Sequence, residues 1–503
     1  MTTVSGPGRV LSLATLGRVP QEMRPALDPG ALSIGVVHLG LGAFHRAHQA
    51  VYTEVAAERS GEHGWGICGV SQRSAGAADV LSAQDGLYSV LCLGSNDRSA
   101  RVVGSLRQAL FAQRDAEVLN ALLAAPEVTV VTLTVTEKGY RYSSGDRRLQ
   151  ADDPELVADA AGRPAVTVLG QLARGLERRK RAGAGPLTVV PCDNIAANGK
   201  LVSHLVREFL SLPGARFEAG LADWVDANVR FPCTMVDRIV PATTERWREE
   251  VSGMLGLADM APVVTEPFSQ WVVQDDFAAA RPPWELAGAD LVADVAPYEA
   301  LKLRALNGTH SALAYLGLLS GATTIAEALG HPELEGFVRR MLDEEVGPTL
   351  DLPPGVSFED YRDSVLSRFA NASLPYRCSQ VATDGSQKLP QRVLGTVRDS
   401  LARGVVPRAA VTVVAAWLLA VRYGKDDKGA GFEVGDPLAG ELRRAMGPGD
   451  GAAPAVAGAL SLRQVFGDDL AGDGRFAEAL TERLDALSRA GALSVAGELA
   501  AGR

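Results

Sequence analysis

The stretch that decides the fold is Ile34-Gly-Val-Val-His-Leu39, followed directly by Gly40-Leu-Gly42-Ala-Phe-His45-Arg46. The first part is a short apolar run typical of a buried β-strand, and residues 47–59 favour a helix. A strand that ends in Gly-x-Gly before a helix offers a tight turn and backbone N–H groups for a dinucleotide pyrophosphate. His45 occupies the third position of the usual GxGxxG pattern, so the pattern is incomplete.

Further β-rich runs follow, separated by polar and helix-compatible segments. They are Trp65-Gly-Ile-Cys-Gly-Val70, residues 128–135 and Pro186-Leu-Thr-Val-Val-Pro191. Strands that alternate with helices predict a mainly parallel sheet covered on both faces. From about Arg281 onward, Leu/Ala-rich segments with helical periodicity take over. We therefore predict an α/β protein with a Rossmann-type dinucleotide-binding domain (1–285) and a mostly α-helical substrate-binding and catalytic domain (286–503).

The composition is that of an ordinary globular protein, with 503 residues of which 47% are hydrophobic and 22% charged. A formal charge of −10 without long basic blocks argues against a nucleic-acid partner. The N-terminus lacks the pattern of a signal peptide. The apolar run 409–421 is too short to cross a bilayer, so we interpret it as a buried helix. We expect a cytoplasmic protein without a membrane partner; the oligomeric state stays open, and a monomer is compatible with the sequence.

The cysteines predict neither a disulfide framework nor a zinc site. There are five, an odd number, and they are far apart without a CxxC pair. We expect them to fill small buried gaps in a reducing compartment. No HExxH pattern is present, and only His45 and His48 have ligand spacing. We therefore expect no metal.

The segment Pro297–His310 is the richest in reactive side chains. On an α-helix, Glu299, Lys302, Asn307 and His310 fall within an arc of roughly 140°. Hydride transfer between an alcohol and a nicotinamide ring needs a base for the hydroxyl proton and donors for the developing oxyanion. A lysine acts as a base when desolvation or a nearby cation lowers its pKa.

This requirement suggests a role for each of the four side chains. Lys302 would be the base and Asn307 the oxyanion donor, while Glu299 would pass the proton to water. His310 would bind a neighbouring substrate hydroxyl. The alternative is a solvated helical face with a capped end.

Two further clusters follow predicted strands. After the second strand, where an Asp or Glu normally binds the adenosine ribose, the chain has Ser71-Gln-Arg-Ser74. Arg73 and the serines tolerate a phosphate, so NADP stays open beside NAD; alternatively, Arg73 is a solvated loop residue. Asn194 and Asn198 follow a later strand, at the sheet edge where ligands bind. They are candidate cofactor and substrate donors, or ordinary turn asparagines.

Together these motifs resemble the long-chain mannitol dehydrogenase family of zinc-independent polyol and hexuronate dehydrogenases, over nearly the whole chain. The motifs that carry the resemblance are Gly40-Leu-Gly-Ala-Phe-His-Arg46-Ala-His, Thr136-Glu-Lys-Gly-Tyr140, Cys192-Asp-Asn, Phe231-Pro-Cys-Thr-Met-Val-Asp237-Arg-Ile, Glu266-Pro-Phe, the spaced Lys302, Asn307 and His310, and Asp384-Gly-Ser-Gln-Lys388.

The resemblance implies a nicotinamide cofactor and catalysis by a lysine base, Lys302. It implies that Asn198 and Asn307 stabilise the oxyanion, that Glu299 relays the proton, and that a sugar acid or ketose is the substrate. The expected substrate contacts are Asp237, His310, Lys388, Gln380, Lys138 and Arg392. The expected cofactor contacts are Gly40, Gly42, Phe44, His45, Arg46, Arg73 and Asn194, with NAD as the cofactor and NADP not excluded.

Within the family, several stretches resemble the fructuronate reductases more than the mannitol 2-dehydrogenases. Mannitol 2-dehydrogenases typically have an arginine where this chain has Gln380. Lys138, Lys388 and Arg392 could bind a uronate carboxylate. The pair Cys378-Ser379 and the missing ribose-binding acid depart from the expected pattern. We expect NAD-dependent reduction of D-fructuronate to D-mannonate, with a mannitol 2-dehydrogenase or related polyol dehydrogenase as the alternative. A dinucleotide-binding regulator without catalysis is the rival from another class.

Overall fold

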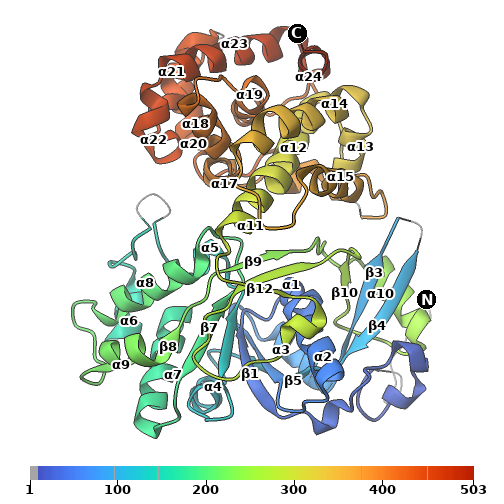
Figure 1. Ribbon diagram of the computed structural model, residues 1–503, viewed down its shortest axis with the longest axis vertical. Coiled ribbons are helices and arrows are strands. Elements are labelled where there is room, and N and C mark those ends of the chain that lie inside the picture. The colour runs from blue at the N-terminus through green and yellow to red at the C-terminus, as the bar shows by residue number, and fades with distance from the viewer. Residues whose placement is uncertain (1–9, 96, 144–146, 375, 450, 503) are drawn as a thin grey trace. The chain divides into compact units, whose positions relative to one another are not determined.

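The computed structural model describes residues 10–95, 97–143, 147–374, 376–449 and 451–502 (Figure 1). The chain divides into two compact units, Met1–Val295 (unit 1) and Ala296–Arg503 (unit 2). Unit 1 is built on a parallel sheet with helices, and unit 2 is mostly helical. The predicted fold class is confirmed.

The main sheet of unit 1 has six strands in the order β5-β2-β1-β6-β7-β8, and all its pairs are parallel. This order is that of a Rossmann fold, and it reverses between β1 and β6, where ligands bind in such sheets. The strands are β1 (Ile34–Leu39), β2 (Gly66–Ser71), β5 (Leu106–Phe111), β6 (Val130–Leu133), β7 (Leu187–Pro191) and β8 (Val229–Arg230).

Alternate residues of each strand pack into two cores because helices cover both faces of the sheet (Figure 1). Val37 and Val131 face the core formed with α4, α7 and α8, whereas Val36 and Val130 face the core formed with α2 and α3. These helices are α2 (Gln49–Ser60), α3 (Gly76–Ala83), α4 (Ala116–Leu123), α7 (Val168–Ala182) and α8 (Asn198–Leu210); the others in unit 1 are α1 (Ala43–Ala47), α5 (Thr136–Gly139), α6 (Pro154–Ala160), α9 (Leu221–Asn228) and α10 (Glu245–Leu255).

The helix expected over residues 47–59 begins earlier and is broken. α1 starts at Ala43, and α2 follows after a break at His48, which has φ −122° and ψ −89°. At this break the His48 ring is held by a distant segment, because its Nε2 donates to the Gln270 carbonyl oxygen at 2.9 Å. The ring also packs edge-on against Trp271, with 5.7 Å between the centroids.

Two small sheets in unit 1 were not predicted from the sequence. One has β3 (Tyr88–Leu93) between β4 (Arg98–Val103) and β10 (Val263–Thr265), and the other has β11 (Gln270–Gln274) between β9 (Thr234–Asp237) and β12 (Asp290–Val292). Both sheets join segments that lie far apart in the chain.

Unit 2 is organised around α12 and α19, whose side chains are almost all buried. Residues 409–421 lie within α19 and are buried, as predicted. The helices are α11 (Ala296–Leu301), α12 (Gly308–Ser320), α13 (Ile325–Leu329), α14 (Pro332–Arg340), α15 (Phe358–Phe369), α16 (Cys378–Val381), α17 (Gly385–Arg392), α18 (Leu394–Ala402), α19 (Arg408–Tyr423), α20 (Ala439–Met446), α21 (Ala452–Leu460), α22 (Arg463–Gly472), α23 (Gly474–Ala490) and α24 (Ala492–Ala500), with π-helical turns at Lys302–Asn307 and Met341–Val346.

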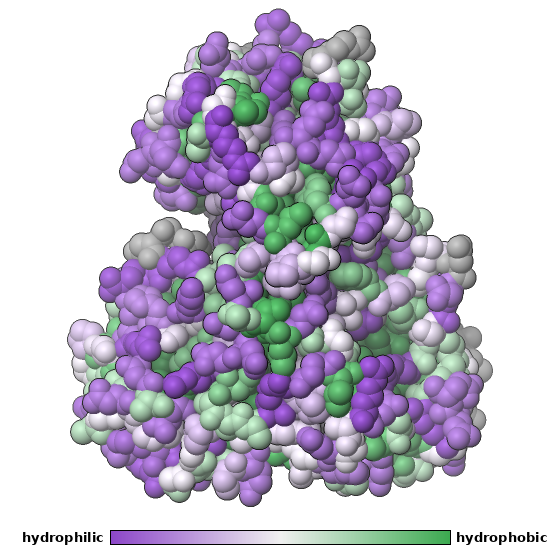
Figure 2. All heavy atoms as spheres, viewed as in Figure 1, coloured by the Kyte–Doolittle hydropathy of each residue, from purple (hydrophilic) through white to green (hydrophobic). Residues whose placement is uncertain are grey.

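The molecular surface and the cysteines agree with an ordinary globular protein. Hydrophilic residues cover most of the face shown in Figure 2, with smaller groups of hydrophobic residues among them. Among the helices described, none combines the length and the apolar character needed to span a membrane. All five cysteines are free, and all but Cys92 are buried. Burial raises the pKa of the Cys378 thiol to about 12, so this thiol stays protonated.

Candidate active site

The glycine turn after β1 lies where the strand order reverses. Gly40 has a φ of +110°, and a Cβ atom there would lie 2.0 Å from the carbonyl oxygen of Thr134, which follows β6. Only glycine therefore fits at this position. The Gly40 carbonyl oxygen accepts a hydrogen bond from the Thr134 hydroxyl at 2.9 Å, which ties the two strand ends together.

Gly42 has a different role, because its backbone is ordinary (φ −111°) and a Cβ there would have no atom closer than 3.6 Å. It faces a cavity of about 600 Å³ in unit 1. The cavity is lined by residues 40–42, 71–74, 77, 134–136, 138, 139, 141 and 166–168. Three of these residues, Arg73, Lys138 and Arg141, are cations, and none is Asp or Glu.

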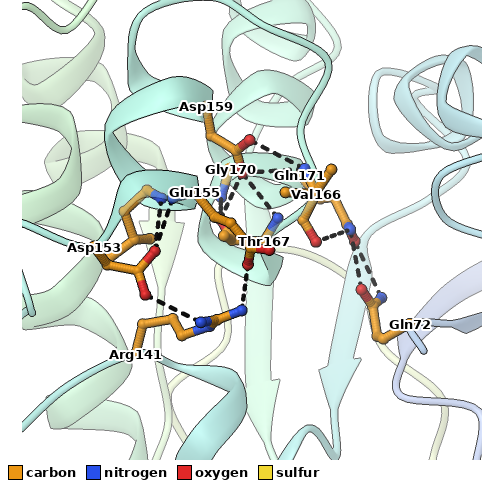
Figure 3. Close-up of polar contacts among 10 residues, drawn as sticks. Gln72, Arg141, Asp153, Glu155, Asp159, Val166, Thr167, Gly170 and Gln171 are labelled. Carbon is orange, nitrogen blue, oxygen red and sulfur yellow. Dashed lines mark hydrogen bonds and ion pairs between the residues drawn. The ribbon is translucent and has the colours of Figure 1, made fainter.

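The far wall of this cavity is held by hydrogen bonds that Figure 3 shows. The Asp159 carboxylate accepts bonds from the Val166 N–H at 3.1 Å and from the N–H and hydroxyl of Thr167 at 2.8 and 2.7 Å. Thr167 in turn accepts the N–H of Gly170 and so caps α7. Hydrogen bonds within the chain therefore hold this wall in place.

A second wall is a strained turn anchored by a buried carboxylate. Thr136 has a φ of +67°, which is rare for a β-branched residue. Its N–H donates to Asp193 at 2.7 Å, and the Tyr140 hydroxyl donates to the same carboxylate at 2.6 Å. Burial raises the pKa of Asp193. The predicted clusters 136–140 and 192–194 thus meet, through an aspartate to which the sequence analysis gave no role.

The two asparagines after β7 differ in their surroundings. Asn194 is exposed, whereas Asn198 is buried. The Asn198 amide group donates to the carbonyl oxygens of Asp193 and Thr234 at 3.1 and 3.0 Å, and its oxygen accepts the Thr234 N–H at 2.9 Å. An oxyanion-binding role would require Asn198 to exchange one of these bonds.

Phe44, His45 and Arg46 do not line the cavity. The His45 ring is fully buried and stacks on His38, with 3.4 Å between the centroids, and burial lowers its pKa well below 6.5. Arg46 donates to the Ala261 carbonyl oxygen. Arg46 also donates to the Gly42 carbonyl oxygen at 3.3 Å, and the Phe44 ring stacks on His48 with 5.0 Å between the centroids. Stacking on His38, which the sequence analysis missed, explains how a histidine fits in place of the third glycine.

In unit 2 the predicted reactive helix contains a π-helical turn, Lys302–Asn307, between α11 and α12. The wider i→i+5 turn changes the angular positions that an α-helix predicts, and such turns are frequent at functional sites. Lys302, Asn307 and His310 are 6, 6 and 8% exposed, and Glu299 is partly buried. They do not form a solvated face.

Three side-chain polar atoms in this segment are buried without a hydrogen-bond partner among the described residues: Asn307 Nδ2, Thr309 Oγ1 and His310 Nε2. The His310 ring lies between the rings of Phe369 and Tyr376, at 4.7 and 4.9 Å between centroids. Because an unpaired buried polar group is costly, such atoms are expected where a ligand completes the bonding.

Three cations act electrostatically on His310. Burial lowers its pKa well below 6.5, and the positive charges of Arg392, Arg368 and Lys388 lower it further. The imidazole is therefore neutral. Arg392 donates to the hydroxyl of Ser311, next to His310, at 3.2 Å. Arg368 is a residue that the sequence analysis did not single out.

The motif 384–388 positions two of these cations. Asp384 has a φ of +57°, and a Cβ at Gly385 would lie 2.5 Å from Trp417 Nε1. Asp436 accepts bonds from the N–H and hydroxyl of Ser386 at 2.8 and 2.6 Å and so holds the start of α17. The helix then carries Lys388 and Arg392 one turn apart. Asp436 was not predicted, because nothing in its local sequence indicates this contact.

The remaining predicted residues lie as follows. Asp237 ends β9 and is buried, Lys138 lines the cavity of unit 1, and Gln380 is exposed on α16. Within the described ranges, no group of three or more His, Cys, Asp or Glu side chains could hold a metal ion.

Two family models match the chain: the mannitol dehydrogenase Rossmann domain over residues 34–286 and the mannitol dehydrogenase C-terminal domain over residues 294–488. Mannitol 2-dehydrogenase of Pyrenophora tritici-repentis is 40% identical, over 92% of this chain and 81% of its own. D-mannonate oxidoreductase of Escherichia coli is 39% identical, over 93 and 96%. Pseudomonas fluorescens mannitol 2-dehydrogenase, solved as a ternary complex with NAD and D-mannitol, matches with a TM-score of 0.88 at 34% identity, over 98 and 100% of the two chains.

Substitutions at the two glycines of the turn should differ in their effect on the stability of the protein. We expect Gly40→Ala to lower the melting temperature strongly or to prevent folding, because its Cβ collides with the Thr134 backbone. Gly42→Ala should keep the melting temperature within a few degrees of that of the parent protein, because it should lower the free energy of unfolding by about 1 kcal/mol or less. Its added methyl group should narrow the cavity. Thermal unfolding measures both. An equal loss of stability in the two variants would contradict this account of the turn.

Proposed function

Because the chain belongs to the mannitol dehydrogenase family of oxidoreductases, we propose that it reduces D-fructuronate to D-mannonate with NADH, reversibly and without a metal. The observation that carries the choice of substrate is the surroundings of His310 in unit 2. A buried, neutral imidazole with an unpaired nitrogen lies within the field of Arg368, Lys388 and Arg392.

Positive charge of this kind suits a substrate that carries a carboxylate. An arginine can bind a carboxylate through two parallel hydrogen bonds, and a lysine adds a point charge. Asp384 lies 4.0 Å from Lys388 and offsets part of this charge. A neutral polyol can accept hydrogen bonds from these cations but has no charge to pair with them.

The proton transfer is assigned to the π-helical turn. Lys302 donates a proton to the keto oxygen as hydride is added to the keto carbon. In the reverse direction Lys302 accepts the proton from the alcohol. Asn307 Nδ2, which is buried without a partner among the described residues, donates to the same oxygen while negative charge develops. His310 binds an adjacent hydroxyl, Glu299 exchanges the proton with water, and Asn198 is the proposed second oxyanion donor.

A nicotinamide dinucleotide fits unit 1, on the evidence of the cavity itself. Its volume of about 600 Å³, the open face of Gly42 and the cationic lining suit a phosphate-containing ligand. Gly40, Gly42 and Asn194 are the proposed contacts for the parts that NAD(H) and NADP(H) share, and Arg73 is the proposed contact beside the adenosine ribose; Phe44, His45 and Arg46 follow the turn. When bound, NADH supplies the hydride that converts the keto carbon to an alcohol.

The second candidate is the oxidation of D-mannitol or a related polyol. It is favoured by a mannitol 2-dehydrogenase relative that is as similar to this chain as the D-mannonate oxidoreductase, at 40 and 39% identity. It would bring no negative charge to the cations near His310.

The proposed substrate is tested by NADH oxidation with D-fructuronate and D-fructose side by side, for the parent protein and for Arg392→Gln. We expect turnover of fructuronate to dominate. The substitution should raise KM for fructuronate about tenfold or more because it removes a charged hydrogen bond, and should leave the slow reaction with fructose unchanged.

The matched control is Arg444→Gln, because Arg444 is exposed on α20. It should leave both reactions unchanged. A preference of the parent protein for fructose, or equal effects of Arg392→Gln on both substrates, would favour the polyol assignment instead.

Replacement of the proposed base tests the chemistry. Lys302→Ala should lower kcat by about 10²- to 10⁴-fold, since a positioned acid–base group contributes that much, and should leave NADH affinity nearly unchanged. Lys428→Ala, at an exposed lysine of unit 2, should behave like the parent protein. Stopped-flow measurement of a single turnover gives the rate, and fluorescence titration gives the affinity. A loss of less than tenfold in rate would rule out Lys302 as the base.

A further inference from the structure

The end of β2 decides which dinucleotide a Rossmann domain accepts. In NAD sites an Asp or Glu at this position binds the hydroxyls of the adenosine ribose, and its negative charge repels a 2′-phosphate. In NADP sites a nearby cation binds that phosphate instead. In this chain β2 ends at Ser71, and residues 71–74 line the cavity of unit 1.

No carboxylate is present among the residues that line this cavity. Two acids near this lining have other partners: one is close in sequence to Ala77, and the other is bound to Arg141. Asp79, on α3, pairs with Arg114 at 2.7 Å. Asp153 pairs with Arg141 at 3.0 Å, as Figure 3 shows. The repulsion that excludes a 2′-phosphate from NAD-specific sites is therefore missing from the cavity lining.

The turn after β2 is closed by its own hydrogen bonds. The Ser71 hydroxyl donates to the Ser74 carbonyl oxygen at 2.5 Å. The side-chain amides of Gln72 and Gln171 exchange two hydrogen bonds of 3.0 Å each (Figure 3). Gln72 is thus held against α7, and Arg73 stands at the tip of the turn.

Arg73 differs from the other arginine of the cavity. Arg141 forms ion pairs with Asp153 and Glu155. Arg73 is exposed and, within the described part of the chain, forms no hydrogen bond or ion pair through its guanidinium group. Its five N–H donors are available to an anion at the rim.

We propose that this cavity accepts the 2′-phosphate of NADP(H), with Arg73 as its ionic partner and the Ser74 hydroxyl as a further donor, so that the chain binds NADP(H) as well as NAD(H). The inference rests on the proposed function only in that a nicotinamide dinucleotide is the cofactor. NAD(H) stays acceptable because serine hydroxyls can also bond to an unmodified ribose.

The test is calorimetric binding of NAD⁺ and NADP⁺ to the parent protein, to Arg73→Ala and to a control, Arg246→Ala. Arg246 is exposed on α10 and does not line the cavity. We expect the two dissociation constants of the parent protein to lie within about tenfold of each other. Arg73→Ala should weaken the binding of NADP⁺ about 10- to 100-fold and that of NAD⁺ less than about twofold. The reason is that NAD⁺ lacks the 2′-phosphate with which Arg73 would form an ion pair.

Two further readouts report on the phosphate contact itself. Adenosine 2′,5′-bisphosphate should bind more tightly than adenosine 5′-monophosphate to the parent protein, and this advantage should disappear in Arg73→Ala. NADP⁺ binding should also weaken more steeply with salt than NAD⁺ binding, since an exposed ion pair is screened.

Each remaining outcome has one meaning. If NAD⁺ binds and NADP⁺ binds more than about 100-fold more weakly, the inference is overturned while the proposed function stands. If NADP⁺ binds equally well to Arg73→Ala and to the parent protein, the role of Arg73 is overturned. If neither dinucleotide binds, the proposed function fails as well.

Discussion

The close approach of Gly40 to the carbonyl oxygen of Thr134 is the constraint on which the dinucleotide cavity depends. The ends of β1 and β6 meet where the strand order reverses, and they lie so close together that no side chain fits at Gly40. His38 and His45 fill the space behind this turn with two stacked, neutral rings. Two carboxylates hold the walls of the cavity: Asp193 binds the turn at Thr136 and the Tyr140 hydroxyl, and Asp159 binds the loop at Val166 and Thr167.

In the second unit, several polar side chains are buried away from water. The π-helical turn buries Lys302 and Asn307, and two aromatic rings enclose His310. Each unpaired buried atom costs about 1–3 kcal/mol. Stability alone does not explain such an arrangement, whereas a ligand that pairs with these atoms does.

The sequence predicted those features that depend on local patterns. Ile34–Leu39 forms β1 residue for residue, because an apolar run ending in glycine is a local signal. The break at His48 was missed since the residue that holds the His48 ring, Gln270, lies far along the chain. The π-helical turn was missed because apolar spacing does not distinguish it from an α-helix. Asp436 holds the start of α17 from another segment, so no local pattern could reveal it.

The most direct measurement is a crystal structure of the chain with a reduced dinucleotide and D-mannonate. The account predicts that the substrate carboxylate contacts Arg392 or Arg368, that His310 Nε2 and Asn307 Nδ2 both gain hydrogen bonds, and that the hydroxyl formed in the reaction lies against Lys302. A carboxylate bound elsewhere, with His310 Nε2 and Asn307 Nδ2 still unpaired, would contradict the central claim that these buried groups recognise a sugar acid.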